Sequence, residues 1–277
     1  MGVVAGEILI LDKTETETDA TALLCSGPTI TGKNLSDFAT SYFSLDIDNR
    51  QAFPEEFGRR YPALRKLLQP YLRLKLLRQE PFEALITFMC AQGIGMRIIR
   101  RQVDYLSRTF GRQCSATIEG ETISYHAFPA PDALASADPA ALKLCTNNNC
   151  ARARNIVDAA AAVASGKLDL EALKDPEIPL DEARSRLCAQ HGIGLKIADC
   201  ILLFGLHRHS AFPIDTHVHQ YLAEWFSFDE ALKTLTGKNY LLLQRRATDL
   251  FNPDLAGVAG HILFHAWRKE IKRLETF

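Results

Sequence analysis

The chain has 277 residues, of which 47% are hydrophobic and 23% charged, which is the composition of a globular protein able to bury its own core. It contains no apolar run long enough to cross a bilayer, so we expect no membrane partner. The seven cysteines include no C-x-x-C pair, which excludes the usual zinc and iron–sulfur spacings and favours reduced thiols in an intracellular protein.

Charge is unevenly distributed, although the net charge is only −1. Residues 59–112 carry 12 Lys or Arg against 3 Asp or Glu, whereas residues 1–58 carry 3 against 10. A solvated basic helix face and a surface that faces phosphate groups are both consistent with this pattern.

The first 34 residues predict a small antiparallel β segment. Gly6–Asp12 is an apolar run that ends in a turn residue, Thr14–Thr18 alternates β-branched and acidic residues, and Thr21–Cys25 is a third candidate strand. After about residue 35 the apolar period becomes helical, and we expect it to stay helical to the end of the chain.

The first clear helix begins at Pro81, carries an apolar stripe as far as Cys90, and stops at Gly93-Ile94-Gly95. No strand–helix–strand alternation follows, so the fold class is mainly α rather than a parallel-sheet enzyme. The later predicted helices are Ile99–Phe110, Ala153–Ala164, Leu180–Gln190, Val218–Trp225 and Leu255–Ala266.

The most informative segment is Leu187–Cys200, in which one helix runs through Gly192-Ile193-Gly194 into a second helix. The glycines allow a tight turn, and the free N–H groups of the second helix then form an anion site suited to a DNA phosphate. A plain corner between two helices has the same pattern.

Lys196 lies in the first turn of this second helix, where the helix dipole disfavours a cation. A neutral amine is what a Schiff-base nucleophile requires, although an exposed lysine that packs its stem on the turn fits equally. Asp215 follows nineteen residues later, directly before a helical stripe, which predicts an N-cap. A carboxylate fixed at a helix start can also stabilise a sugar cation.

With these features the sequence resembles the helix–hairpin–helix DNA glycosylases, and within them the 8-oxoguanine DNA glycosylase/AP lyase group, over residues 35–270. The resemblance implies two helical lobes, formed by residues 81–205, which end in the helix–hairpin–helix, and by residues 35–80 with 206–277, beside the short β segment 1–34. It is carried by Leu77–Glu83, Arg152–Arg154, Gly192–Cys200, Phe212–His217, Ala256-Gly257 and Ile262–Phe264.

The resemblance also implies a reaction on damaged double-stranded DNA. The damaged nucleotide is flipped out, Lys196 attacks the sugar C1′ and displaces the base, and the resulting Schiff base permits β-elimination 3′ to the lesion. Asp215 is the electrostatic and acid–base partner. Such a protein is expected to act as a monomer where the DNA is, in the cytoplasm of a prokaryote or the nucleus of a eukaryote. It needs no catalytic metal, although hairpin carbonyls hold a structural monovalent cation in relatives.

Further site residues follow from the resemblance. Cys200 and Phe264 would sandwich the flipped base, although each fits a hydrophobic core as well. The residues expected to contact DNA are Gln92, Asn149, Arg152, Arg154, Gly192, Gly194 and His217, and those of the base pocket are Cys200, His261 and Phe264.

Two departures from the family pattern concern base recognition. Relatives often carry a glutamine that reads the pairing edge of the base, where this chain has Gly260; His261 could compensate only if it turned inward. The Gly-Gln-x-Phe-x-Trp segment of relatives is also absent. We therefore expect 8-oxoguanine as the lesion, with looser selectivity than the family norm.

Two other classes of protein remain open. His207 and His209, His217 and His219, and His261 and His265 have spacings that can hold zinc, and a metallohydrolase would use Asp215 as ligand or base. H-x-H ligands usually need a strand to bring both rings to one side, and this region is predicted to be helical. A non-catalytic DNA-binding module would use the hairpin alone.

Overall fold

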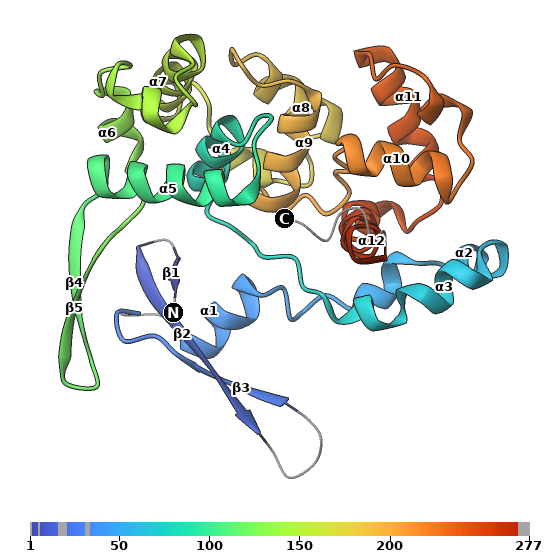
Figure 1. Ribbon diagram of the computed structural model, residues 1–277, viewed down its shortest axis with the longest axis horizontal. Helices are drawn as coiled ribbons and strands as arrows, with labels where there is room; N and C mark the ends of the chain where they lie inside the picture. The colour runs from blue at the N-terminus through green and yellow to red at the C-terminus, as the bar shows by residue number, and fades with distance from the viewer. Residues whose placement is uncertain (1, 5, 16–20, 31–33, 271–277) are drawn as a thin grey trace.

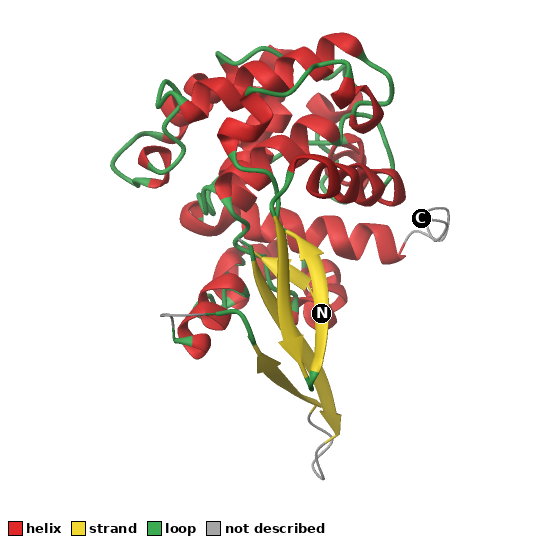
Figure 2. Cartoon of the chain, turned by 90° about the vertical axis from the view of Figure 1, so that its left-hand side faces the viewer, coloured by secondary structure: helices red, strands yellow, loops and turns green. Residues whose placement is uncertain are grey.

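The computed structural model describes residues 2–4, 6–15, 21–30 and 34–270. A helical body carries the strands as extensions below it (Figures 1 and 2), so the predicted mainly helical fold class with a small antiparallel β segment is confirmed. The helices are α1 (Leu35–Tyr42), α2 (Glu55–Arg60), α3 (Pro62–Leu68), α4 (Pro81–Cys90), α5 (Met96–Phe110), α6 (Pro131–Ala135), α7 (Cys150–Ala164), α8 (Leu180–Cys188), α9 (Leu195–Cys200), α10 (Thr216–Glu224), α11 (Gly237–Thr248) and α12 (Ala256–Glu270).

Two separate hydrophobic cores divide the helical body. One is built from α4, α5, α7, α8 and α9, and it encloses Leu85, Leu106 and Ile156 completely. The other is built from α2, α3 and α10–α12, around Tyr221 and Leu263. The chain passes from one core to the other between residues 211 and 212. The site described below lies along this seam, because α9 belongs to the first core and α10 to the second.

The N-terminal sheet has three antiparallel strands in the order β1 (Gly2–Val4), β2 (Glu7–Glu15) and β3 (Thr21–Ser26). The prediction that the strand ends at Asp12 was wrong, because Asp12 pairs with Leu24 inside a continuous ladder. Of the predicted strand Thr14–Thr18, the last three residues lie outside the described residues.

A second β hairpin, β4 (Gln113–Ile118) with β5 (Glu121–His126), contradicts the expectation that the chain stays helical after residue 35. Its turn is Glu119-Gly120, with φ of +51° and +86°, which is the two-residue turn that matches the twist of paired strands. β-Branched residues on both sides favour the extended backbone.

The helix after the hairpin turn is short. α9 ends at Cys200 and passes directly into a π-helical turn over Ile201–Gly205. Such turns are rare in proteins, and those that occur are often found at functional sites. The extra residue redirects the side chains that follow. Within the described part of the chain, no helix combines the length and the apolar character needed to span a bilayer.

Candidate active site

The hairpin between α8 and α9 has the geometry of an open anion site. Gly192 has φ +86°, a conformation that side-chain-bearing residues rarely adopt, and Gly194 caps the start of α9. A Cβ placed on Gly194 would have no atom within 4 Å, so the N-cap of α9 borders open space. Ile193 is buried and anchors the turn. The first N–H groups of α9 have no partner within the helix and are available at this open N-cap.

Lys196 is half-buried at the start of α9, and its Nζ lies 6.0 Å from the centroid of the Phe88 ring. The Cys200 thiol lies one turn further along. Burial raises the pKa of Cys200 to about 12; the Lys196 ammonium opposes this shift, and Asp215 adds to it. The thiol is therefore neutral, and Lys196 and Asp215 both lie within electrostatic range of one sulfur atom.

Asp215 is the N-cap of α10, as predicted. Its Oδ1 accepts a hydrogen bond from the Val218 N–H at 2.8 Å, which satisfies one of the free donors at the helix start. The carboxylate is half-buried and held at one position relative to α10. This arrangement suits a fixed negative charge close to a reacting sugar.

A chain of aromatic contacts leads from Lys196 to α12. Phe88 packs against Phe204 of the π-helical turn with ring centroids 5.5 Å apart, and His261 meets Phe204 edge-on at 5.5 Å. Burial, with a smaller contribution from His265, lowers the pKa of His261 to about 4. His261 is therefore a neutral ring at physiological pH, and it lies on the lysine side of α12.

Gly260 has a structural reason for lacking a side chain. A Cβ at this position would lie 2.5 Å from the Phe212 ring, so Phe212 fills the space that a longer residue would need. One turn further along α12, Phe264 packs on His217 with ring centroids 5.8 Å apart. Phe264 thus lies beside the start of α10, where Asp215 is the N-cap.

Four of the residues expected to contact DNA form one hydrogen-bonded group. Gln92 donates to the Gly192 carbonyl at 3.0 Å, and Arg152 donates to the Gln92 carbonyl at 3.1 Å. Asn149 caps α7 and accepts from the Arg152 N–H at 2.9 Å. Arg154, also on α7, is exposed. The structure therefore brings α4, α7 and the hairpin together beside the open start of α9.

A second glycine hairpin, which the sequence analysis treated only as a helix stop, joins α4 to α5. Gly93 has φ +73°, and Gly95 caps α5 with the same extended backbone that Gly194 uses at α9. The signal was present in the sequence, since G-I-G-M-R at residues 93–97 parallels G-I-G-L-K at residues 192–196. Arg97 stands at the position that corresponds to Lys196.

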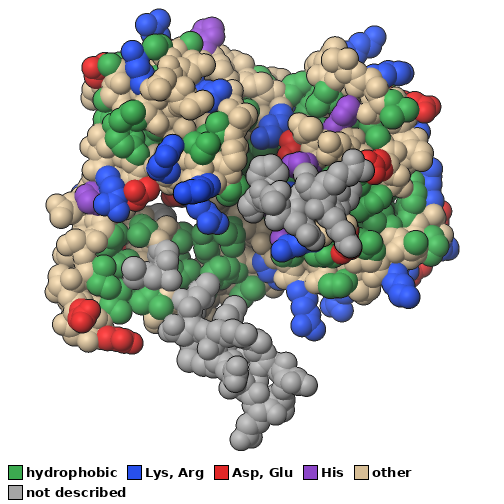
Figure 3. Space-filling view, in the orientation of Figure 1, with side chains coloured by type: hydrophobic (Ala, Val, Ile, Leu, Met, Phe, Trp, Pro, Cys, Tyr) green, Lys and Arg blue, Asp and Glu red, His purple; other side chains and the backbone are tan. Residues whose placement is uncertain are grey.

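The basic stretch 59–112 is partly neutralised by ion pairs with acidic residues. These pairs are Arg59–Glu56, Arg78–Asp46 and Arg108–Asp104. Arg97, Arg100 and Arg101 are exposed on α5 and have no ion pair among the described residues. Lys and Arg side chains accordingly lie along the α5 region of the face shown in Figure 3.

The histidine pairs do not converge on one ligand set. Within the described residues no three His, Cys, Asp or Glu side chains lie together as metal ligands would. His207 Nε2 lies 3.2 Å from the Gln79 carbonyl, and burial lowers the pKa of His209 to about 4. His261 and His265 face different neighbours, Phe204 and Tyr71 respectively.

Comparison with known proteins gives a consistent picture. Residues 1–85 match the family described as 8-oxoguanine DNA glycosylase, N-terminal domain, so the likeness includes the β segment that the sequence analysis left outside it. The chain is 31% identical over 185 residues to the N-glycosylase/DNA lyase of Saccharomyces cerevisiae, covering 64% of this chain and 48% of that protein. It is 32% identical over 218 residues to N-glycosylase/DNA lyase OGG1 of Arabidopsis thaliana, covering 76% and 56%.

Solved structures agree over nearly the whole chain. MBOgg1 in complex with a low-affinity DNA ligand has a TM-score of 0.76 at 26% identity, covering 98% of this chain and 85% of that one. The 8-oxoguanine glycosylase/lyase of Clostridium acetobutylicum in complex with DNA has the same TM-score at 24% identity, covering 97% and 84%, and shows the shared fold. The chain spans about half the length of the curated relatives it matches.

Proposed function

The chain belongs to the helix–hairpin–helix DNA glycosylase superfamily, close to the 8-oxoguanine glycosylases, and on that footing we propose that it is a bifunctional DNA glycosylase and AP lyase of base-excision repair. Its substrate is duplex DNA that carries a damaged base. The observation that carries this proposal is the position of Lys196 in the first turn of α9 and of Asp215 at the N-cap of α10, on the two sides of the seam between the cores.

The geometry supports the following reaction. The neutral Lys196 amine attacks C1′ of the flipped nucleotide, the glycosidic bond breaks, and the base leaves with a proton. The C1′–O4′ bond then breaks as O4′ takes up a proton, and the lysine nitrogen forms a Schiff base with C1′. Removal of a C2′ proton then breaks the C3′–O bond by β-elimination, and the 3′ phosphate leaves. Asp215, held by Val218, stabilises the positive charge that develops on the sugar. The open start of α9 binds one DNA phosphate.

Base recognition rests on Cys200, Phe264 and His261. Cys200 and Phe264 flank the base, and 8-oxoguanine is the lesion we propose. Because Phe212 fills the space beside Gly260, no side chain at that position can bond the pairing edge. The neutral His261 ring is a donor at one nitrogen and an acceptor at the other, so it can take over part of this recognition. We expect this recognition to discriminate less strongly among damaged bases than a glutamine at position 260 would.

Borohydride trapping tests the lysine assignment. Wild-type protein on duplexes with 8-oxoguanine or an abasic site should yield a covalent protein–DNA adduct, and Lys196→Gln should yield none while DNA affinity stays within about threefold, because the hairpin amides are unchanged. Lys238→Gln is the matched control, since Lys238 is an exposed lysine in the first turn of α11. Full adduct yield from Lys196→Gln would overturn the assignment.

A lesion panel tests the substrate. Single-turnover cleavage should be fastest on 8-oxoguanine, measured opposite each of the four bases. Because no side chain at position 260 bonds the pairing edge of the lesion, discrimination against other bases should be weaker by about 1–3 kcal/mol. If 8-oxoguanine is untouched while an alkylated base is removed quickly, the substrate proposal is wrong although the lysine chemistry stands.

The proposal extends to the state of the protein. We expect a monomer that works where the DNA is, in the cytoplasm of a prokaryote or the nucleus of a eukaryote, which sedimentation and imaging of a tagged chain can check. The hairpin carbonyls are neutral oxygen donors suited to a monovalent cation, so replacing potassium with tetramethylammonium should weaken DNA binding. EDTA should leave cleavage intact.

A further inference from the structure

A buried polar network lies directly beneath the hairpin. Asp199 is completely buried, and its Oδ1 accepts from Arg184 Nε at 2.7 Å. Its Oδ2 accepts from the Tyr240 hydroxyl and from Gln244 Nε2, each at 2.7 Å. Side chains from α8 and from two turns of α11 therefore converge on one carboxylate of α9. Burying a carboxylate is costly unless its oxygens are bonded in this way.

The same network also holds the segment that leads into Asp215. Gln244 Nε2 donates to the Phe212 carbonyl at 2.7 Å, and the Tyr240 hydroxyl accepts from the Ile214 N–H at 3.1 Å. Ile214 immediately precedes Asp215, and Asp199 lies three residues after Lys196 on the same helix. Through two consecutive hydrogen bonds, Tyr240 thus connects the helix that carries Lys196 to the residue that precedes Asp215.

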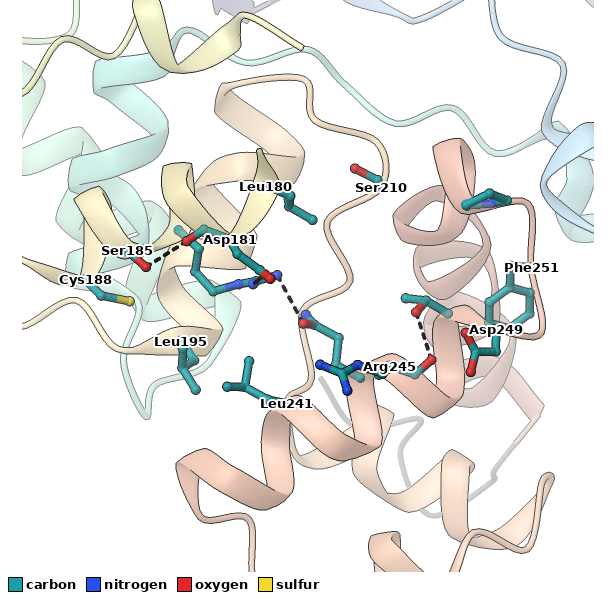
Figure 4. Close-up of a pocket in the computed structure, with 14 residues that line it drawn as sticks. Leu180, Asp181, Ser185, Cys188, Leu195, Ser210, Leu241, Arg245, Asp249 and Phe251 are labelled. Carbon is teal, nitrogen blue, oxygen red and sulfur yellow. Dashed lines mark hydrogen bonds and ion pairs between the residues drawn. The ribbon is translucent and has the colours of Figure 1, made fainter. Parts of the chain in front are cut away.

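Buried hydrogen bonds join the two halves of the molecule beside a cavity. A cavity of about 750 Å³ separates α8 from α11 on this side, with Leu195 and Leu241 on its walls. In Figure 4, α8 with Asp181 and Ser185 faces α11 with Leu241 and Arg245 across this space. The bond from Arg184 Nη2 to Gln244 Oε1, 3.1 Å long, joins two residues that line this cavity. These polar bonds act together with Leu195 of α9, which packs against the second core.

The charge state of the network is consistent with a rigid role. Burial raises the pKa of Asp199, and Arg184 with the hydroxyl and amide donors opposes that rise. The same contact with Asp199 raises the pKa of Arg184 against the effect of burial. Burial also raises the pKa of Tyr240, so its hydroxyl keeps the proton it donates.

We infer that the Tyr240–Asp199–Gln244 network is a positioning device that sets the distance between Lys196 and Asp215 across the seam of the two cores. The inference rests on the proposed lysine chemistry. None of the three residues touches the substrate in this assignment; they act by holding α9 and the Phe212–Ile214 segment in register. A shift of about 1 Å in a catalytic group can lower a rate by about 100-fold.

Tyr240→Phe is the sharpest test, because it removes one hydroxyl, changes no charge, and cuts both the bond to Asp199 and the bond from Ile214. Single-turnover borohydride trapping on abasic-site DNA gives a rate constant and an amplitude. We expect the rate constant to fall by about 10-fold to 100-fold. The amplitude, which counts folded protein, and the Kd for DNA with an uncleavable abasic analogue should stay within about twofold of the wild type.

Two further variants keep the result interpretable. Tyr105→Phe removes a comparable hydroxyl bond, 3.1 Å to the Ala141 carbonyl, in the other core, and it should trap at the wild-type rate. Gln244→Met keeps the shape of the side chain and frees the Phe212 carbonyl, so it should slow trapping as Tyr240→Phe does. Faster hydrogen exchange at the Ile214 amide in Tyr240→Phe is an independent sign that the segment has been released.

The outcomes separate the two proposals. If wild-type protein forms no adduct, the proposed function fails. If wild type forms the adduct and Tyr240→Phe forms it at the same rate, the chemistry stands and the positioning role is wrong. The positioning role is also wrong if only amplitude falls, because the network would then serve stability alone.

Discussion

The two glycine hairpins share a local sequence and a local backbone, yet their surroundings differ. Gly93–Gly95 leads into α5 and an exposed Arg97, whereas Gly192–Gly194 leads into α9 and a half-buried Lys196. Lys196 lies over Phe88 and beside the neutral Cys200 thiol. The same motif therefore begins a helix with unpaired N–H groups in both places, but only the second places a lysine near an aromatic ring and a buried thiol.

The largest expected effect comes from moving the lysine between hairpins. The double variant Arg97→Lys/Lys196→Gln puts a lysine at the corresponding position of the first hairpin and should form no trapped adduct, because that amine is exposed and lies on a different hairpin from the one that faces Asp215. Borohydride trapping measures this, with Arg97→Lys alone as the control that should trap normally. An adduct in the double variant would mean that the hairpin itself, rather than its surroundings, supplies the reactivity.

The next effect concerns binding through the first hairpin. Replacing Arg97, Arg100 and Arg101 with Gln should weaken binding to undamaged duplex DNA. The slope of the logarithm of the binding constant against the logarithm of the salt concentration should become shallower by about 0.9 for each phosphate that these arginines neutralise. Titrations at several salt concentrations measure both quantities. The matched control replaces Arg59 and Arg108, which already pair with acidic residues, and should change the slope little. An unaltered slope in the first variant would place α5 away from DNA.

Acid should destabilise the surroundings of the second hairpin through His261. Its folded pKa of about 4 lies below its ordinary value of 6.5, so between these values the unfolded chain binds more protons. The stabilising contribution of the neutral ring is therefore present above pH 6.5 and lost as the pH falls toward 4, by up to about 3 kcal/mol. As the pH falls from 6.5 toward 4, the free energy of unfolding of the wild type should therefore decrease relative to that of His261→Phe. A constant difference would contradict burial of the ring.

The smallest effect separates the two left-handed glycines. Gly93→Ala and Gly192→Ala both force a side chain into a positive φ, at a cost of about 1–2 kcal/mol each. A Cβ on Gly192 would in addition lie 2.7 Å from the Asn155 amide, whereas one on Gly93 meets nothing within 4 Å. Urea unfolding should therefore show Gly192→Ala to be the more destabilised of the two, and equal losses would show that Asn155 moves aside freely.

Several elements could be predicted because their signals are local. Pro81 begins α4 as expected, and Asp215 caps α10, since both positions depend on the free donors of a helix start a few residues away. The turn at Gly192–Gly194 was predictable for the same reason. The β4–β5 hairpin was missed although Glu119-Gly120 is a local turn signal, because its strands alternate polar and apolar residues too weakly to outweigh the helical period on either side.

The sequence by itself determined the two residues to which we assign the chemistry: a lysine after a glycine turn, and an aspartate at the start of a helix. Only the tertiary structure decided that Phe212 fills the space beside Gly260, that His261 lies against Phe204, and that Asp199 joins α8, α9 and α11. The physical reason is range. Turns and caps are bonds between near neighbours in the chain. The bonds across the seam join residues 41 to 60 positions apart, which meet only when both cores have folded.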